Sequence, residues 1–417
     1  MKGHIRERSP GHWAIVIDQP TETGERKRKW HSFEGNKRQA QIECARLISA
    51  IQSGSYVAPS KLTLAEFLDR WLEHTKSQVS PKSHERYSGI INQNLKTALG
   101  SVHLSKLKPV QISAAYSKAL ANGRRDGTGG LSPRTVNHMH RVLKQALGQA
   151  VRWELLTRNP ADAVDPPRVG WVPMQTYDLR QTVELIEVVR QTPLLMPTLL
   201  AVLCGLRRGE ICAVRWRNVD LTAGQLSVVE SLEQTKAGLR FKSPKSGKGR
   251  TVALSSTMVD ELRAHRATRA QELLRLGVGP SDDDLVIAHP DGSLVQPIYI
   301  SQLWGRTIKR TKLAQLRFHD LRHAHATHLL ANGVHPKVAS ERLGHSRVGI
   351  TLDLYSHVIP GMQEDAAATV DAALKTAIRS REESNGSNPV AGASAERIEN
   401  SFVVGNSIGW NGGHDQN

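Results

Sequence analysis

The sequence has few cysteines, few aromatic residues and no long apolar run. Only 3 of the 417 residues are cysteines, too few for a disulfide framework, and no Cys-x-x-Cys pair indicates a zinc ribbon. We expect buried free thiols at three positions among apolar residues at helical spacing: Cys44, Cys204 and Cys212. No run approaches the roughly 18 apolar residues that a membrane span needs. Residues 1–10 are charged and lack the apolar core of a secretory signal, so we expect a cytoplasmic protein.

Acidic residues are too few to balance the basic ones. The chain has 39 Asp and Glu residues against 56 Lys and Arg residues, a formal net charge of +17. Such a charge attracts polyanions, and the release of counterions makes that attraction strong and salt-dependent. No basic amphipathic anchor for a membrane surface is evident, so nucleic acid is the favoured partner. The length is enough for two or three domains, each with its own core.

The first part of the chain predicts a small sheet followed by a helix. Residues 12–17 and 27–33 are strand-like, and residues 21–24 form a turn between them. Asn36 can cap a helix that ends at Gly54. The turn and the second strand carry a basic run followed by a tryptophan: Arg26, Lys27, Arg28, Lys29 and Trp30. A two-stranded ribbon fits the major groove of DNA, so we interpret this run as a DNA contact, with a solvated basic hairpin as the alternative.

The next segment, residues 60–158, predicts four short amphipathic helices. Thr63 and Glu66 form a capping box before the first helix. A proline opens each of the other three helices, at Pro81, Pro109 and Pro133. A compact bundle that clamps DNA and an ordinary helical bundle fit this pattern about equally well.

Three further segments complete the chain. Prolines stiffen residues 159–172, which we expect to be a domain linker. A mixed α/β region follows, from about Met174 to Ser380. Residues 384–417 are rich in Gly, Ser and Asn with few periodic apolar positions, so we expect a disordered tail.

The mixed region holds four motifs that mean little singly. The first is Gly205-Leu206-Arg207-Arg208-Gly209-Glu210, which follows an apolar helix over residues 199–204. Two glycines beside adjacent arginines permit a tight junction between helices, where one guanidinium turns inward and Glu210 braces it. A solvated pair of arginines is the alternative.

The second motif is a segment that carries lysines. Residues 239–242 and 250–254 alternate as strands and predict a hairpin whose tip carries Lys245 and Lys248. Lysines at loop tips are usually solvated. Such a lysine can, however, protonate a leaving oxygen when docking against DNA lowers its pKa.

The third motif, residues 317–323, begins a helix. His319 and Arg322 are three positions apart, so both side chains can project from one face toward one phosphate. A metal site formed by neighbouring histidines is the alternative. His323 and His325 are poorly spaced for this on a helix, and Arg322 would repel a cation, so we expect no metal.

The fourth motif is Leu343-Gly344-His345, with Tyr355 following ten residues after the histidine. A tyrosine hydroxyl has a reference pKa of about 10, so an attacking phenolate needs strongly positive surroundings. Taken alone, Tyr355 is more simply read as a buried structural residue. The whole set changes that balance, because two arginines and a histidine could neutralise a pentavalent phosphorane while a lysine and a histidine move protons.

In this order, the motifs resemble those of the phage-integrase family of tyrosine recombinases. The matching elements are Gly-Leu-Arg-x-Gly-Glu, a hairpin lysine, His-x-x-Arg, Leu-Gly-His and a tyrosine ten residues later. The resemblance covers residues 174–380 and implies a mainly helical catalytic domain with a small antiparallel sheet. Residues 60–165 are similar to the family's helical, SAM-like core-binding domain. Residues 1–57 resemble the three-stranded arm-binding domains of lambda-like and conjugative-element integrases, so we expect a multidomain α+β chain.

The resemblance implies how the phosphate would be bound and attacked. Arg207, which the family spacing selects over its neighbour Arg208, would grip the scissile phosphate together with Arg322. Tyr355 would attack that phosphate, giving a 3′-phosphotyrosine and a free 5′-hydroxyl. His345 would hydrogen-bond a non-bridging oxygen. The family's energy-conserving bond implies that neither ATP nor a metal cofactor is needed.

The resemblance also implies which groups would move protons. Lys245 would be the general acid toward the leaving oxygen, and we favour it over Lys248, although hairpin tips vary. His319 would exchange a proton with Tyr355. Glu210 would hold Arg207 in place without itself contacting the phosphate.

The end of the chain bears on assembly. Residues 362–378 have apolar positions at helical spacing and predict a final helix, whose simplest role is packing on its own domain. The resemblance implies instead that it docks on a neighbouring protomer of a homotetramer bound to double-stranded attachment sites. A host DNA-bending protein and an excision directionality factor are further candidate partners that the sequence neither requires nor excludes.

The expected function is therefore site-specific recombination that integrates and excises a prophage or integrative element at the bacterial nucleoid. The main alternative is a non-catalytic DNA-binding regulator that retains the fold, but binding alone has no need of Tyr355 or Lys245. A metal-dependent nuclease would need the histidine cluster. A type IB topoisomerase shares the chemistry, but the arm-like start and the final helix fit it poorly.

Overall fold

The computed structural model describes residues 3–20, 26–52, 61–170, 174–244, 247–355 and 362–386. The chain divides into two compact units, Met1–Leu354 and Tyr355–Asn417, and each is considered by itself. Within the described residues of the first unit, three separate hydrophobic cores form in three successive segments of the chain.

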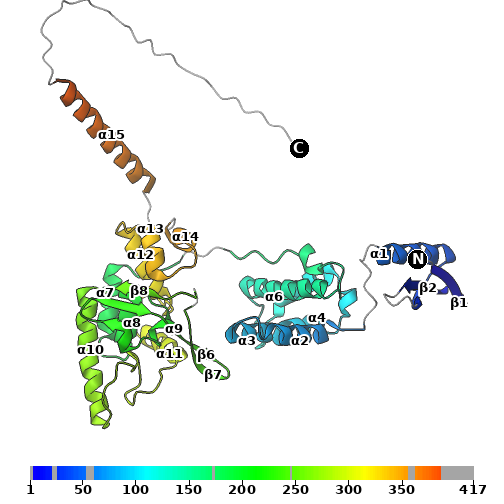
Figure 1. Ribbon diagram of the computed structural model, residues 1–417, viewed down its shortest axis with the longest axis horizontal. Helices are drawn as coiled ribbons and strands as arrows, with labels where there is room; N and C mark the ends of the chain where they lie inside the picture. The colour runs from blue at the N-terminus through cyan, green and yellow to red at the C-terminus, as the bar shows by residue number, and fades with distance from the viewer. Residues whose placement is uncertain are drawn as a thin grey trace, which may run out of the picture. The chain divides into compact units, whose positions relative to one another are not determined.

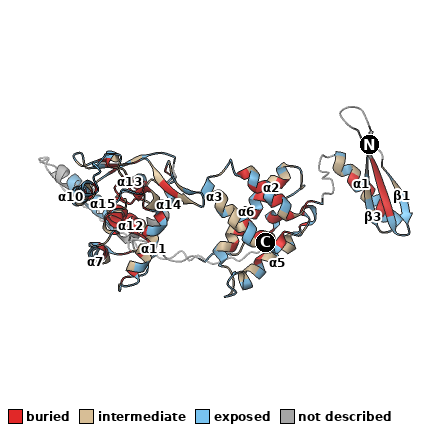
Figure 2. Cartoon of the chain, turned by 90° about the horizontal axis from the view of Figure 1, so that it is seen from below, coloured by how far each residue is buried: buried red, intermediate tan, exposed pale blue. Residues whose placement is uncertain are grey.

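The first segment is a three-stranded antiparallel sheet with one helix packed on it (Figure 1). The elements are β1 (Gly3–Ser9), β2 (His12–Pro20), β3 (Arg26–Glu34) and α1 (Lys37–Gln52). Ile15 and Ile17 of the central strand pack with Cys44 and Leu47 of α1, and Figure 2 shows this strand buried between more exposed neighbours. The three-stranded sheet with its helix is confirmed, although the residue pattern itself indicated only β2 and β3. The turn predicted at residues 21–24 lies outside the described residues.

The second segment is a helical bundle. Its main elements are α2 (Leu64–Thr75), α3 (Pro81–Ile90), a π-helical turn (Ile91–Leu95), α4 (Lys96–Leu99), α5 (Pro109–Asn122) and α6 (Pro133–Arg152). The predicted capping box is present, since the Thr63 hydroxyl accepts from the Glu66 N–H and the Glu66 carboxylate accepts from the Thr63 N–H. The four predicted helices are confirmed, and the second is interrupted by the π-helical turn.

The predicted linker begins as part of this bundle. Residues Pro160–Ala163 form a 3-10 turn, and both Ala161 and Val164 are buried in the core of the bundle. Treating all of residues 159–172 as an extended spacer was therefore wrong at its start. The prolines there do not prevent packing, because a proline at the first position of a helical turn leaves no hydrogen bond unmade.

The third segment is mainly helical and contains two small antiparallel sheets. Its helices are α7 (Leu179–Val189), α8 (Leu195–Cys204), α9 (Arg208–Ile211), α10 (Ser256–Arg275), α11 (Pro297–Ile308), α12 (Asp320–Ala331), α13 (Pro336–Leu343) and α14 (Gly349–Tyr355). Its strands are β4 (Val219–Asp220), β5 (Gln225–Val228), β6 (Ser231–Thr235), β7 (Gly238–Lys242) and β8 (Arg250–Ala253). The nearly all-apolar α8 is central, because α7, α9, α10 and α12 all pack against it. This arrangement confirms the expected helical domain with a small antiparallel sheet.

The lysine-bearing segment is not the hairpin that the strand pattern predicted. β7 pairs with β6, and β8 pairs with β5, so the two predicted partners belong to different sheets. Only two residues separate β6 from β7, and Gly238 adopts a left-handed φ of 125° at that turn. Closing so short a loop costs little entropy, while Val252 of β8 pairs with the buried Leu226 of β5. Alternation identified these strands but not their partners.

The second unit contains α15 (Met362–Gly386). The predicted final helix is confirmed and is longer than expected. Residues 384–386 are helical rather than disordered, because the charged residues that precede them favour helix, and residues 387–417 lie outside the described part of the chain. On this helix Val370, Leu374 and Ile378 are exposed. None of the described helices is long and apolar enough to span a membrane.

The three cysteines are buried free thiols, as the sequence predicts: Cys44, Cys204 and Cys212. Burial raises the pKa of the Cys204 and Cys212 thiols to about 12. The reactive species of a cysteine is the thiolate, so these two side chains are inert core residues.

Candidate active site

The junction between α8 and α9 presents Arg207. Gly205 ends α8 in the left-handed conformation (φ 66°), and Arg207 is the residue that precedes α9. The Arg207 guanidinium donates to Glu210 Oε1 (2.8 Å) and to the Gly344 carbonyl (2.9 Å). Its backbone N–H donates to Glu210 Oε2 (2.9 Å). Arg208 donates instead to the Ser301 hydroxyl on α11, so Arg207 is the one of the two arginines that contacts Glu210 and Gly344.

Glu210 is a buried anion held by arginines. Its side chain is 1% exposed, and Arg250 Nη2 donates to Oε2 at 2.8 Å while Arg250 Nη1 donates to Oε1 at 3.1 Å. Burial alone would raise the pKa of this carboxyl. The hydrogen bonds and charges of Arg250 and Arg207 outweigh burial and lower the pKa of Glu210 to about 2, so the carboxylate is ionised at neutral pH.

Helix α12 brings Arg322 to the same place. Arg322 is buried, and its guanidinium donates to the carbonyls of Gly205 and Leu343. These carbonyls lie at two matching turns, where Gly205 and Gly344 each end a helix in the left-handed conformation. Burial and, next, the charge of Arg207 lower the pKa of Arg322 to about 9. The guanidinium is therefore still positive at pH 7.

His319 lies immediately before α12. Its ring packs edge-to-face against His323, with centroids 5.2 Å apart. Burial lowers its pKa to about 4, with further lowering from His323 and Arg322. The imidazole is therefore neutral at pH 7 and has a lone pair with which to accept a proton.

His345 follows the left-handed Gly344 at the end of α13. Its backbone N–H donates to the Ser340 carbonyl (3.0 Å), and its Nδ1 lies 2.8 Å from the Thr351 hydroxyl. Burial and then the charges of Arg322 and Arg207 lower the pKa of His345 to about 4. The structure thus brings together one arginine from the α8–α9 junction, one from α12 and a histidine from the turn after α13.

An open cavity of about 640 Å³ adjoins this cluster. Arg207 and His319 both line it. The rest of the lining is mostly apolar or neutral, but it includes three further basic residues: Arg208, Lys309 and Arg317. A cavity lined by several cations focuses a positive potential, which suits a phosphate group.

The two candidate lysines and the tyrosine are only partly described by the structure. Lys245 lies outside the described residues, between β7 and β8, and Lys248 is exposed. Tyr355 is the last residue of α14, and its side chain lies outside the described part of the structure. The roles of these three residues stay predictions.

The histidines of α12 do not converge. His325 Nδ1 lies 2.7 Å from the Val202 carbonyl, and His328 Nε2 lies 3.4 Å from the Thr182 hydroxyl. His323 faces His319 instead. Across the described residues, no group of three or more His, Cys, Asp or Glu side chains is arranged to hold a metal ion.

Comparison with known proteins matches two family models to this chain. The model described as "Phage integrase family" matches residues 176–361, and "Phage integrase, N-terminal SAM-like domain" matches residues 63–120. The chain belongs to the phage integrase family. It is an enzyme of the tyrosine recombinase type, a site-specific recombinase.

Relatives and solved structures agree with this assignment. A tyrosine recombinase XerC-like protein of Caldanaerobacter subterraneus is 26% identical over 356 residues, which cover 80% of this chain and 89% of the relative. The ICEBs1 integrase of Bacillus subtilis is 24% identical over 355 residues, covering 84% and 94%. A Tn1549 transposon integrase bound to a circular intermediate DNA shares the fold with a TM-score of 0.62 and 19% identity, over 75% of this chain and 99% of that one. For a lambda integrase tetramer bound to a Holliday junction, the TM-score is 0.52 at 19% identity, over 82% and 95%.

Two residues of this integrase hold the site together although their motifs did not point to them. Arg250 was predicted only as the start of a strand, and Thr351 was given no role. Arg250 reaches Glu210 across 40 positions of sequence, whereas Thr351 reaches His345 across only 6. A basic residue at the inward-facing end of a strand was the one available signal for Arg250, and Thr351 had none.

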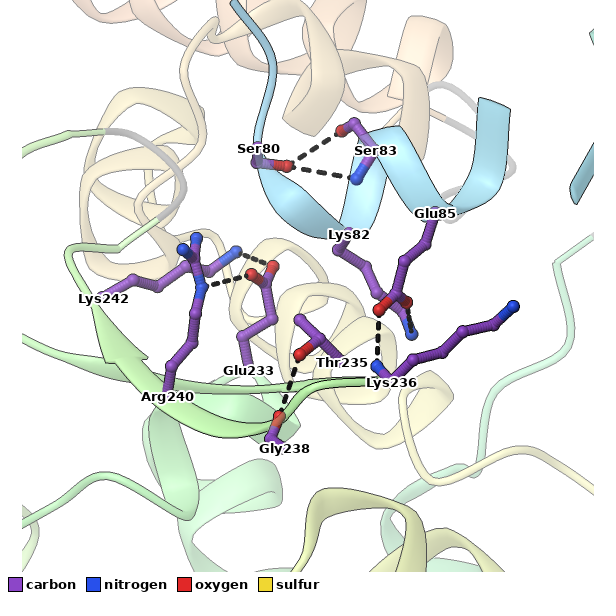
Figure 3. A network of polar contacts seen from close by, with 10 residues as sticks. All are labelled: Ser80, Lys82, Ser83, Glu85, Glu233, Thr235, Lys236, Gly238, Arg240 and Lys242. Carbon is purple, nitrogen blue, oxygen red and sulfur yellow. Dashed lines mark hydrogen bonds and ion pairs between the residues drawn. The ribbon is translucent and has the colours of Figure 1, made fainter. Parts of the chain in front are cut away.

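The β6–β7 ribbon of the integrase is fixed by polar contacts at its base and its tip, as Figure 3 shows. Near the base, Glu233 accepts hydrogen bonds from Arg240 Nε (2.9 Å) and from Lys242 Nζ. At the tip, the Lys236 N–H donates to the Glu85 carboxylate of α3 at 2.5 Å. These contacts fix the β6–β7 ribbon up to Lys242, the last residue of β7.

The basic run of the N-terminal sheet lies on β3. Arg28 and Trp30 are exposed, and the guanidinium of Arg8 lies 5.8 Å from the centre of the Trp30 ring. The side chains of Arg26, Lys27 and Lys29 lie outside the described residues. Contact between this strand and DNA stays a prediction.

We expect Thr351→Val to slow strand cleavage about tenfold, the equivalent of one lost hydrogen bond of ~1.4 kcal/mol. Valine keeps the buried shape but removes the hydroxyl that orients the His345 ring. Single-turnover cleavage of a nicked substrate measures the effect. The control is Thr268→Val on α10, where the hydroxyl bonds only to its own helix. Equal rates for the native chain and Thr351→Val would show that His345 needs no such support.

Proposed function

We propose that this integrase inserts and excises a prophage or integrative element by cutting and rejoining DNA through a 3′-phosphotyrosine at Tyr355. The observation that carries the proposal is the meeting of Arg207, Arg322 and His345 beside a basic cavity. Two charged guanidiniums there can stabilise the negative charge that grows on a phosphate under attack. The names of the ICEBs1 and Tn1549 integrases support a mobile element as the substrate.

The proposed step transfers one phosphoryl bond. Tyr355 Oη forms a bond to phosphorus while the bond from phosphorus to the 5′-oxygen breaks. His319, neutral at pH 7, accepts the phenolic proton. Lys245, or Lys248 in its place, gives a proton to the leaving oxygen, which departs as a 5′-hydroxyl. The reverse attack by a 5′-hydroxyl of another strand rejoins the DNA, so neither ATP nor a metal cofactor takes part.

His345 is proposed to hydrogen-bond a non-bridging phosphate oxygen. When the Thr351 hydroxyl donates to Nδ1, the imidazole carries its proton on Nε2. That proton is then available for a phosphate oxygen. The depressed pKa of His345 keeps the ring neutral before DNA binds.

Assembly on DNA is part of the proposal. The integrase would act as a homotetramer on double-stranded attachment sites at the bacterial nucleoid, with α15 docked on a neighbouring protomer. The exposed apolar residues of α15 support this, namely Val370, Leu374 and Ile378, as does the tetramer known for lambda integrase on a Holliday junction. A host DNA-bending protein and an excision directionality factor stay candidate partners.

A nicked suicide substrate tests the proposal. A nick close to the cleavage site lets the short 5′-hydroxyl fragment diffuse away, so the covalent protein–DNA adduct accumulates. We expect an adduct that resists denaturation and forms equally well in EDTA. DNA binding without any adduct would favour a regulator, and adduct-free cleavage that EDTA abolishes would favour a metal-dependent nuclease.

The arm-binding role proposed for residues 1–57 has its own test. Deleting these residues should remove one of two distinct DNase footprints and spare binding at the core site, because the bundle and the catalytic segment have their own cores. Footprinting the full chain and the deletion on the same DNA makes the comparison. An unchanged footprint would count against an arm-binding role.

We expect the cleavage rate of this integrase to fall at a lower pH than the ordinary pKa of a histidine would predict. The folded pKa values of His319 and His345 are both about 4, so these rings protonate only as the pH falls toward 4. The rate at subsaturating DNA reports the free enzyme, and we expect it to hold through pH 6 and to drop near pH 4 to 5. In the unfolded chain the same histidines protonate near pH 6.5, so the free energy of unfolding should also fall as the pH drops from 6.5 toward 4. An acid limb centred near pH 6.5 would contradict the neutral assignment.

A further inference from the structure

Arg250 occupies an unusual position for a strand residue. It is the first residue of β8, directly after the segment that carries Lys245, and its side chain is 10% exposed. Its guanidinium makes three hydrogen bonds, two to the Glu210 carboxylate and one from Nε to the Arg342 carbonyl (2.9 Å). Each of its three nitrogens therefore donates to a partner inside the protein.

These bonds join three parts of the site. Glu210 belongs to α9 and also binds Arg207, while Arg342 lies in the last turn of α13, just before Gly344 and His345. Arg250 thus ties the strand after the lysine segment both to the carboxylate behind Arg207 and to the turn that presents His345.

Gly344 shows how closely the guanidinium approaches that turn. A Cβ built on Gly344 would lie 3.0 Å from Arg250 Cδ and 3.1 Å from Arg250 Nη1. The left-handed φ of 65° at Gly344 already favours glycine. Arg250 therefore packs directly against the backbone that sets the direction of His345.

We propose that Arg250 is a positioning residue for strand cleavage: its forked hydrogen bonds hold Glu210 and the Gly344 turn in register, so that Arg207 and His345 face the same phosphate. The inference rests on the proposed function. Arg250 is assigned no contact with DNA and acts through Glu210 and the Gly344 turn. The charge of Arg250 is one part of its role and the fork geometry is the other.

The pKa of His345 is a quantity that can be measured for each variant in addition to its folding. The charged and titratable groups that act on His345 are Arg322, Arg207, His323 and Arg250, and together with burial they all lower its pKa. Removing the charge of Arg250 should therefore raise the pKa of His345. A lysine at this position keeps the charge but cannot form the fork.

The experiment compares the full-length native chain with Arg250→Met and Arg250→Lys. Arg263→Met serves as the matched control, because Arg263 lies exposed on α10, where it pairs with Asp260 and donates to the Leu221 carbonyl. Near-UV circular dichroism gives the folded fraction at the assay temperature. Adduct formation on the suicide substrate, DNA affinity and the NMR titration of His345 are then measured for each chain.

We expect both Arg250 variants to cleave about 100-fold more slowly, as a misplacement near 1 Å would cause, with DNA affinity within about threefold of native. The pKa of His345 should rise in Arg250→Met and stay near native in Arg250→Lys. Native cleavage by Arg250→Lys would overturn the proposal, because charge would then suffice. A loss that matches the unfolded fraction or the loss of DNA affinity would also overturn it.

The failure of the proposed function has a different signature. If the native chain forms no adduct, the assignment of strand cleavage falls. The NMR titration needs no reaction, and it still decides whether the charge of Arg250 acts on the His345 ring. An unchanged His345 pKa in Arg250→Met would then overturn the positioning role as well.

Discussion

Tyr355→Phe is expected to abolish the covalent adduct, with a loss on the order of 10⁴-fold or more, as removal of a nucleophile causes in other enzymes. The substitution deletes one oxygen atom and keeps the ring. Folding and DNA affinity should therefore stay close to native. The adduct on a nicked suicide substrate is measured on a denaturing gel, and DNA affinity by a mobility shift with an intact site. Tyr299→Phe on α11 is the control, since it makes the same change in the same segment of the chain.

An adduct that survives Tyr355→Phe would point to another nucleophile. Tyr116 and Tyr177 are poor replacements, because burial raises the pKa of both phenols and neither is open to a bulky substrate. Peptide mapping of the trapped adduct would then identify the residue that does attack. Mapping to any other residue would show that Tyr355 is not the nucleophile.

The charge balance of the site explains why such a nucleophile could work at neutral pH. Three guanidiniums, of Arg207, Arg250 and Arg322, surround one carboxylate, that of Glu210. Among the residues that the structure describes, Arg322 forms no ion pair, and its guanidinium donates to two backbone carbonyls. Carbonyls satisfy its N–H groups without cancelling its charge, so the cluster keeps a net positive charge for a phosphate.

Local signals in the sequence predicted most of the fold. The Thr63–Glu66 capping box, the prolines that open helices and the break at Gly205 all correspond to element ends in the structure. The pairing of β7 and β8 was predicted wrongly, because alternation gives a strand its faces but not its neighbour. The packing of Val164 on the bundle was missed for a similar reason, since long-range contact leaves no local pattern.

The residues of the candidate site also fall into those that local signals predicted and those that they did not. The spacing of the motifs was enough to select Arg207, His319, Arg322 and His345, which the structure brings together. The supports behind them depend on contacts across 92 and 40 positions of sequence, from Arg250 to Arg342 and to Glu210. No periodicity or motif encodes such distances, so these residues become visible only after the chain is folded.

Glu210→Gln is expected to cost about 3 kcal/mol of folding free energy, in the range for breaking a buried ion pair. The glutamine side chain has the same shape but carries no charge and one oxygen fewer, so Arg207 and Arg250 lose their shared partner. The pKa of Glu210 is lowered to about 2 in the folded chain. The stabilisation that Glu210 contributes is therefore present above about pH 4.5 and is lost as the pH falls toward 2. Strand cleavage should fall about 100-fold, because Arg207 is no longer held in place.

Glu233→Gln is the matched control. Glu233 is also a nearly buried carboxylate with two basic partners, but Arg240 and Lys242 are themselves 41% and 31% exposed. Water already screens these partners, so we expect a loss of about 1 kcal/mol or less and near-native cleavage. Denaturant unfolding of the full chains, followed by tryptophan fluorescence, measures both variants. If Glu210→Gln is no more destabilising than Glu233→Gln, the two arginines do not depend on a shared buried anion, and the site must be held in place by the backbone carbonyls at Gly205, Leu343 and Gly344.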